Sequence, residues 1–194
     1  MALHAGHKLY TSADLRALEA LPENADKKFE LIAGEIFEVT TGTPEHAFII
    51  LLLASKLLQF VLNHDLGFVF TDTVTYQLSE EHEYIPDVSY ISRESQAELP
   101  PKRYYVAPDL AVEVMSPSNQ PQDMLRKIET YFQYGTRLVW LIYPDTRTVW
   151  VYEPQADGSW RLSKTAYEGT LDGGDVLPGF SIPVREIFPP QSAA

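Results

Sequence analysis

The sequence contains no cysteine, which removes several kinds of chemistry at once. Without thiols the chain has no disulfides, no thiolate metal ligands and no cysteine nucleophile. Its 194 residues suffice for one hydrophobic core and are too few for two full cores. Hydrophobic residues make up 45% and charged residues 22%, the composition of an ordinary globular protein. We therefore expect a single domain over residues 1–194.

Basic residues are also scarce, since 15 lysines and arginines face 27 acidic residues and the net charge is −12. Nucleic-acid-binding proteins normally carry a basic patch, and this bulk charge opposes tight nonspecific binding of DNA or RNA. This excess of acidic residues counts against a nuclease. It does not exclude one, because a bound divalent cation reverses the sign of the charge at the site.

Long apolar runs are missing as well. The most apolar stretch, FIILLLA at residues 48–54, is far shorter than the ~20 residues that span a bilayer. The N-terminus lacks the basic, apolar and small-residue segments of a signal peptide. We expect no membrane association, a cytoplasmic protein, and a helix at residues 48–54 that is buried on most of its sides.

Several catalytic motifs are absent. The chain has no GxSxG elbow, no P-loop and no GxGxxG, so serine hydrolysis and nucleotide cofactors are not indicated. Its five histidines show neither HExxH nor zinc-finger spacing, which argues against a zinc site.

The patterns that are present predict alternating helices and strands. Helices are expected from Thr11 or Ser12 to Pro22, over 43–64 and over 122–135. A hairpin is expected at 29–39, one half-buried strand over 68–78 and a turn or loop at 80–84. Further strands are expected at 87–92, 109–116, 137–144, 148–154 and 159–167, with a short docked strand in the tail 177–188. The order predicts an α/β fold with a central mixed sheet flanked by helices.

Two carboxylates lie on neighbouring candidate strands. Asp87 follows Pro86, an ordinary turn position, and opens the strand 87–92. Glu113 interrupts the apolar strand 109–116, on the face that it shares with Ala111 and Met115. An edge strand with this face in water is the alternative. If the two strands pair, both carboxylates can converge on one cation, because Mg²⁺ is usually held by carboxylates, waters and a substrate phosphate.

A lysine on the following helix completes the pattern. Lys127 and Tyr131 lie four residues apart and so share one helix face. The alternative is a lysine whose stem covers the core while its ammonium reaches water. In the functional interpretation the ammonium points at the carboxylates and stabilises charge on a scissile phosphate or orients the attacking water.

These residues carry a resemblance to a known family. Pro86-Asp87, followed by Glu113-Val114-Met115, resembles the PD-(D/E)XK nuclease superfamily. The chain is similar to its bacterial "putative restriction endonuclease" branch over roughly residues 10–188. The likeness is carried in order by FELIAGEI, PEH before an apolar helix, YIPDVSYIS, APDLAVEVMSPSNQ, the helix with Lys127, VWLIYPDTRTVWVYE and LPGFSIPV.

The resemblance implies a restriction-endonuclease-like fold and an endonuclease that hydrolyses DNA with Mg²⁺, or with Mn²⁺, RNA being the alternative substrate. Asp87 and Glu113 would be the metal ligands, with the backbone carbonyl of Val114 as a third. The lysine of the superfamily motif should stand at position 115, where this chain has Met115. In the branch it resembles, the following helix supplies that lysine, here Lys127.

The resemblance also implies further site residues and a partner. Glu30 matches an acidic position that often lines such sites, and we count it as a catalytic candidate. His46 matches a recurrent position, although a lone histidine is more often a packing or capping residue. Such domains generally work as homodimers. The apolar strands that carry Trp140, Trp150 and Trp160 could supply the interface.

Two other functions remain open. One is a non-catalytic dimeric binding module of the same fold, favoured by the charge of −12 and by Met115. The other is a phosphodiesterase acting on small molecules, for which an acidic surface matters less. Replacing both Lys102 and Arg103 by alanine should weaken a DNA enzyme and leave a small-molecule enzyme unchanged.

Overall fold

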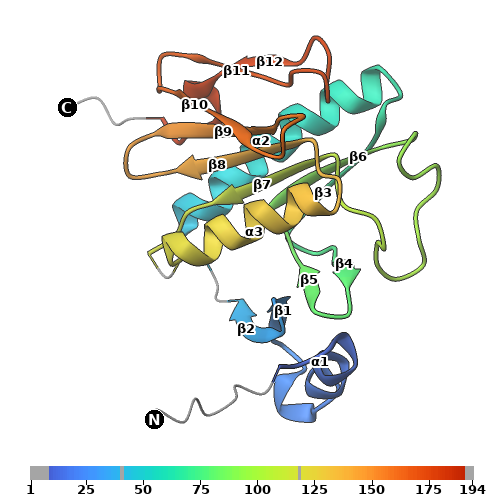
Figure 1. Ribbon diagram of the computed structural model, residues 1–194. Helices are drawn as coiled ribbons and strands as arrows, with labels where there is room; N and C mark the ends of the chain where they lie inside the picture. The colour runs from blue at the N-terminus through green and yellow to red at the C-terminus, as the bar shows by residue number, and fades with distance from the viewer. Residues whose placement is uncertain (1–8, 40–41, 118, 191–194) are drawn as a thin grey trace.

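A six-stranded mixed sheet forms the centre of the computed structural model, which describes residues 9–39, 42–117 and 119–190 (Figure 1). Its strand order is β10-β9-β8-β7-β6-β3. The strands are β3 (Gly67–Thr71), β6 (Val88–Ser92), β7 (Leu110–Val114), β8 (Leu138–Tyr143), β9 (Thr148–Pro154) and β10 (Trp160–Thr165). β7 and β8 run parallel and the other neighbours antiparallel. The expected fold class, a mixed sheet flanked by helices, is confirmed.

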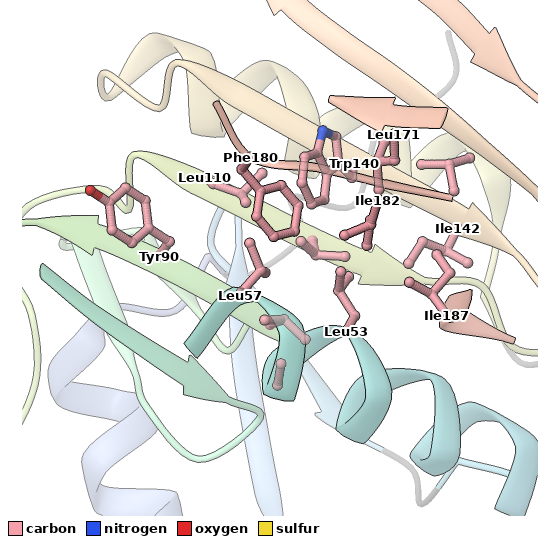
Figure 2. Close-up of a cluster of buried hydrophobic side chains, with 14 of the residues drawn as sticks. Leu53, Leu57, Tyr90, Leu110, Trp140, Ile142, Leu171, Phe180, Ile182 and Ile187 are labelled. Atoms are coloured by element: carbon pink, nitrogen blue, oxygen red, sulfur yellow. The ribbon is translucent and has the colours of Figure 1, made fainter. Parts of the chain in front are cut away.

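Two helices cover the two faces of this sheet (Figure 1). α2 (Pro44–Asn63) packs on one face, together with the C-terminal segment. Figure 2 shows Leu53 and Leu57 of α2 beside Trp140 and Phe180 in this core. α3 (Pro121–Gln133) connects the parallel strands β7 and β8 and packs on the other face through residues such as Ile128. Both faces of β7 are therefore buried.

The remaining elements form two smaller sheets. The first has the order β2-β1-β5-β4, from β1 (Lys28–Ile32), β2 (Glu35–Val39), β4 (Tyr76–Ser79) and β5 (His82–Tyr84). The second pairs β11 (Thr170–Asp172) with β12 (Ser181–Pro183). α1 (Ser12–Glu19) and the short 3₁₀ helices η1 (Pro22–Asn24) and η2 (Val184–Ile187) complete the structure. β1, β2 and α1 lie at the end of the molecule opposite β11 and β12 (Figure 1).

Local signals explain where the elements begin and end. Thr11 and Asp14 form a reciprocal capping box at the start of α1, and Thr43 caps α2 through its side chain. The β1–β2 hairpin turns at Ala33 and Gly34, whose φ angles of 50° and 76° are those of the primed turn that matches the twist of paired strands. The expected starts of α1 and α2 and the expected hairpin are confirmed within two residues, whereas α1 ends at Glu19, three residues before the expected stop at Pro22.

Two expectations about strands are wrong. Residues 68–78 do not form one strand, because the chain turns after Thr71 and passes from the six-stranded sheet into the four-stranded sheet. Residues 80–84, expected as a loop, contain β5, which pairs with both β4 and β1. Residues such as Thr and Val favour strands on either side of this turn, so their propensity does not reveal the change of sheet.

The expectation of a helix buried on most of its sides holds for residues 48–54, where only Phe48 and Leu51 are exposed, but it does not extend to the whole of α2. Ile49, Leu53 and Leu57 are fully buried, whereas Leu51 and Leu62 are 62% and 66% exposed. Among the described helices, α2 alone is long and apolar enough to cross a membrane, a test that core helices of soluble proteins also pass. The apolar part of α2 is therefore longer than the seven-residue run at 48–54 indicated.

The tryptophans do not form an exposed aromatic surface. Trp140 is fully buried in the core shared with α2. Trp150 packs against Tyr143, and Trp160 against Phe132, both in half-buried positions. The three tryptophan side chains are thus mainly packed against other residues of the same chain.

Candidate active site

The strands that carry the two candidate carboxylates are neighbours. β6 and β7 pair antiparallel with Val88 opposite Val112, which brings Asp87, just before β6, next to the end of β7. One Asp87 carboxylate oxygen (Oδ2) accepts a hydrogen bond from the Val114 N–H at 2.7 Å. Because β7 lies inside the sheet and Glu113 is only 4% exposed, the edge-strand alternative is wrong.

Lys127 joins Glu113 to a third carboxylate. Its ammonium lies 2.9 Å from Glu113 Oε1 and 2.9 Å from Glu30 Oε1. The lysine is 6% exposed, so it does not reach out to water as the alternative interpretation required. α3 thus directs a long side chain toward the carboxylate of β7, while β1 contributes Glu30 from the four-stranded sheet.

Other groups hold these two carboxylates in place. The Tyr131 hydroxyl donates to Glu113 Oε1 at 2.8 Å, and the Ile85 N–H donates to Glu30 Oε1 at 2.7 Å. Buried carboxylates need such donors, because an unpaired charged oxygen away from water is costly. The i, i+4 spacing placed Tyr131 on the face of Lys127, but no sequence signal indicated the Ile85 N–H.

The site has more negative than positive charge. Burial raises the pKa of Glu113 to about 7, and the charges of Asp87 and Glu30 add to the rise while Lys127 opposes it. Burial lowers the pKa of Lys127, but the charges of Glu113 and Glu30 and their hydrogen bonds outweigh this and raise it. The lysine therefore stays protonated, and Glu113 is the carboxyl group that a further cation would most readily ionise.

His46, at the start of α2, contacts two of the groups expected to hold a metal. Its Nε2 lies 3.1 Å from the Val114 carbonyl oxygen and 3.4 Å from Asp87 Oδ2. A carbonyl oxygen can only accept, so Nε2 carries the proton. The hydrogen bond with Asp87 is the main cause that raises the pKa of His46. The histidine is thus part of the site.

The donor set fits a hard divalent cation. Asp87, Glu113 and the Val114 carbonyl offer oxygen atoms, the ligands that Mg²⁺ prefers, and one lysine, Lys127, faces the carboxylates of Glu113 and Glu30. These groups line a cavity of about 210 Å³ that Asn119 and Asp123 border on another side. In the described part of the chain no three His, Asp or Glu side chains are close enough to hold an ion unaided, so waters or a substrate phosphate would complete the coordination.

The basic pair expected to contact DNA is only partly available. Arg103 donates to Glu83 Oε2 at 2.6 Å, and Glu83, 1% exposed, also binds Arg16. Lys102 is exposed. Replacing Arg103 would therefore disturb a buried ion pair, so the double alanine variant cannot separate a DNA enzyme from a small-molecule enzyme.

Comparisons with known proteins identify the family and the fold of this chain. The profile of the Uma2 family, described as "Putative restriction endonuclease", matches residues 14–185. A crystal structure titled as a putative nuclease belonging to DUF820 from Anabaena variabilis superposes with a TM-score of 0.76 and 21% identity. That match covers 90% of this chain and 96% of the other, and at this identity it establishes a shared fold. No curated protein matches the sequence.

Proposed function

Since this chain belongs to the Uma2 family of restriction-endonuclease-like proteins, we propose that it is a divalent-metal-dependent endonuclease that hydrolyses phosphodiester bonds in DNA. The observation that carries the proposal is the convergence of Asp87, Glu113 and the buried Lys127 at one cavity. A structural ion pair would need one carboxylate for one lysine, whereas this site has an excess of carboxylates and a pKa of about 7 at Glu113.

In this proposal each residue has a distinct task. Asp87, Glu113 and the Val114 carbonyl would hold Mg²⁺, with Mn²⁺ as the alternative. The bound ion would activate water and offset the charge that develops on the phosphate. Lys127 favours the ionised form of Glu113 against the effect of burial and contributes a fixed positive charge beside the phosphate. Glu30 and Tyr131 orient the ammonium and the Glu113 carboxylate through their hydrogen bonds.

The first experiment measures metal binding, because it does not require a known DNA sequence. Mg²⁺ and Mn²⁺ are titrated calorimetrically into the wild type, Asp87→Asn and Glu113→Gln. Asn at position 87 keeps an oxygen for the Val114 N–H, so the local fold is preserved while the charge is lost. Asp123→Asn is the matched control, since it removes one charge from the same cavity.

We expect binding in the wild type and in the control, and its loss in both site variants. Cleavage of supercoiled plasmid should follow the same order. Metal binding that persists in Asp87→Asn and Glu113→Gln would contradict the proposed ligands.

The acidic chain favours one second candidate, hydrolysis of a small phosphodiester. The net charge of −12 opposes approach of a nucleic acid more than that of a small anion. Cleavage of bis-p-nitrophenyl phosphate by a wild type that leaves plasmid and single-stranded DNA intact would select this candidate. The two site variants should then lose that activity.

A further inference from the structure

The active-site cavity has an apolar side that the proposed metal chemistry does not use. Asp87, Glu113 and His46 belong to its polar side. The apolar side comes from the four-stranded sheet, where Ile32 of β1 and Phe37 of β2 line the same cavity. A metal ion and a phosphate are recognised by polar and charged groups, so an apolar surface beside them fits another part of the substrate.

Phe37 supplies an aromatic ring on this apolar side. It is paired with Glu30 across the β1–β2 ladder, and directly paired residues of antiparallel strands project from the same face of a sheet. The ring therefore lies beside the carboxylate that binds Lys127. The neighbouring Ile36 lies on the opposite face, where it packs against the small core around Leu15. Because Phe37 is only half-buried and β2 is an edge strand, part of the ring is open to a molecule that enters the cavity.

The cavity offers a nucleic acid little positive charge. Among the described residues that line it, acidic side chains are in excess and Lys127 is the one lysine or arginine. Two cations beside the cavity are themselves paired, since Arg126 lies 3.5 Å from Asp123 and Lys27 lies 3.3 Å from Glu38. Duplex DNA is held mainly by phosphate contacts with lysines and arginines, which this lining does not provide. Stacking of a base on an aromatic ring requires no such charge.

Duplex DNA also keeps its bases away from a ring in this position. Inside a duplex each base is stacked between its neighbours, and enzymes that hold a single base act on single strands or first take the base out of the stack. An unpaired base leaves its face free for an aromatic side chain, a contact that every base can make. A single strand carries about half the charge of a duplex per unit length, so the net charge of −12 opposes its approach less.

We propose that this site acts on single-stranded DNA, with the base next to the scissile phosphate stacked on Phe37. The inference rests on the proposed nuclease function and specifies its substrate. Asp87 and Glu113 then face the phosphate, and the attached base extends toward β2. Negatively supercoiled plasmid unpairs locally and so remains a substrate, whereas relaxed duplex DNA should be cut more slowly.

Binding measurements on three DNA ligands test this placement. Fluorescence anisotropy is recorded for labelled oligo(dT), for the same strand annealed to oligo(dA), and for a strand of equal length whose sugars carry no bases. Ca²⁺, a hard cation that also binds oxygen ligands, replaces Mg²⁺ to slow cleavage. We expect the wild type to bind oligo(dT) about tenfold or more tightly than either of the other two ligands.

Three variants separate stacking from a merely structural role of the ring. Phe37→Leu should bind oligo(dT) no better than the strand without bases, and its affinity for that strand should be unchanged. A variant with a damaged fold would lose affinity for both strands. Phe37→Trp should keep the preference for bases. Phe68→Leu is the matched control, because Phe68 is a half-buried phenylalanine on the edge strand β3 and does not line the cavity.

Several results would overturn the inference: no binding of oligo(dT), equal affinity for strands with and without bases, tighter binding of the duplex, or a base preference that survives Phe37→Leu. Cleavage of a thymidine dinucleotide without binding of oligo(dT) would assign the apolar side to a small phosphodiester instead.

The inference and the proposed function can fail separately. A wild type that binds no metal and cuts no phosphodiester would contradict the proposed function. A wild type that binds metal and cuts relaxed duplex as fast as single strands would contradict the inference alone. Calorimetric metal binding should be the same in the wild type and Phe37→Leu, because the ring is not a metal ligand.

Discussion

Replacing Lys127 by methionine should destabilise the protein in a strongly pH-dependent way. Methionine preserves most of the side-chain volume, so the main change is the loss of the buried ammonium between Glu113 and Glu30. Breaking one side of a buried ion pair costs about 3–5 kcal/mol, and here two carboxylates, those of Glu113 and Glu30, are left without their compensating charge.

Protonation limits this cost and makes it depend on pH. A carboxyl group with an ordinary pKa of 4.5 can be protonated at a cost of about 1.4 kcal/mol for each pH step above that value, thus ~5 kcal/mol at pH 8 and ~2 kcal/mol at pH 6. In the variant the pKa of Glu113 should exceed its wild-type value of about 7, because Lys127 no longer lowers it. A carboxyl whose pKa is raised by folding contributes stability that is present below pH 4.5 and lost as the pH rises through the folded value.

The free energy of unfolding is measured by urea titration at pH 8 and pH 6, with the combined fluorescence of Trp140, Trp150 and Trp160 as the probe. We expect Lys127→Met to lose about 3–5 kcal/mol at pH 8 and less at pH 6, where protonation limits the cost to ~2 kcal/mol for each of the two carboxyl groups. The Glu113→Gln/Lys127→Met double variant should lose most of this pH dependence. An equal loss at both pH values, or a loss below about 1 kcal/mol at pH 8, would refute the reasoning.

Two further predictions concern stability and use the same urea titration. Gly67→Ala should lower the free energy of unfolding by about 3 kcal/mol or more, because the new Cβ would stand 2.1 Å from the Ile91 carbonyl oxygen. Gly158→Ala should lower it by only about 1 kcal/mol, because its new Cβ meets nothing within 4 Å and the only cost is the positive φ. A similar loss in both would contradict the steric cause. Arg103→Ala should cost about 2 kcal/mol, because it removes one partner of a buried carboxylate, whereas the exposed Lys102→Ala should change stability by less than about 0.5 kcal/mol. Equal effects there would show that the ion pair adds nothing.

Much of the arrangement around β7 could be predicted from the sequence, because it depends on short-range periodicity. Alternation along the strand assigned Glu113 to one face and Val112 and Val114 to the other, and the structure has this division. Helical spacing likewise assigned Lys127 and Tyr131 to one side of α3, and both reach Glu113. Such local rules hold wherever an element is regular.

The features that could not be predicted depend on contacts between segments that are distant in the sequence. Glu30 lies 97 residues before Lys127, and their ion pair follows from how the four-stranded sheet meets α3, which no local pattern encodes. The exposed face of α2 was missed for a related reason. A leucine that fills a core and a leucine that lies on the surface look the same in the sequence, so Leu51 and Leu53 could not be distinguished.

The connection from β7 through α3 to β8 has a consequence for how members of such a family are recognised. A helix that links two parallel strands has to return across the strand it has just left, so its inner side always faces that strand. The positive charge beside the glutamate can then come from a lysine on the strand or from a lysine on the helix. Searches that demand a lysine two residues after the glutamate will overlook chains with a residue such as Met115 there. A criterion based on a buried ammonium within bonding distance of the glutamate would retain them.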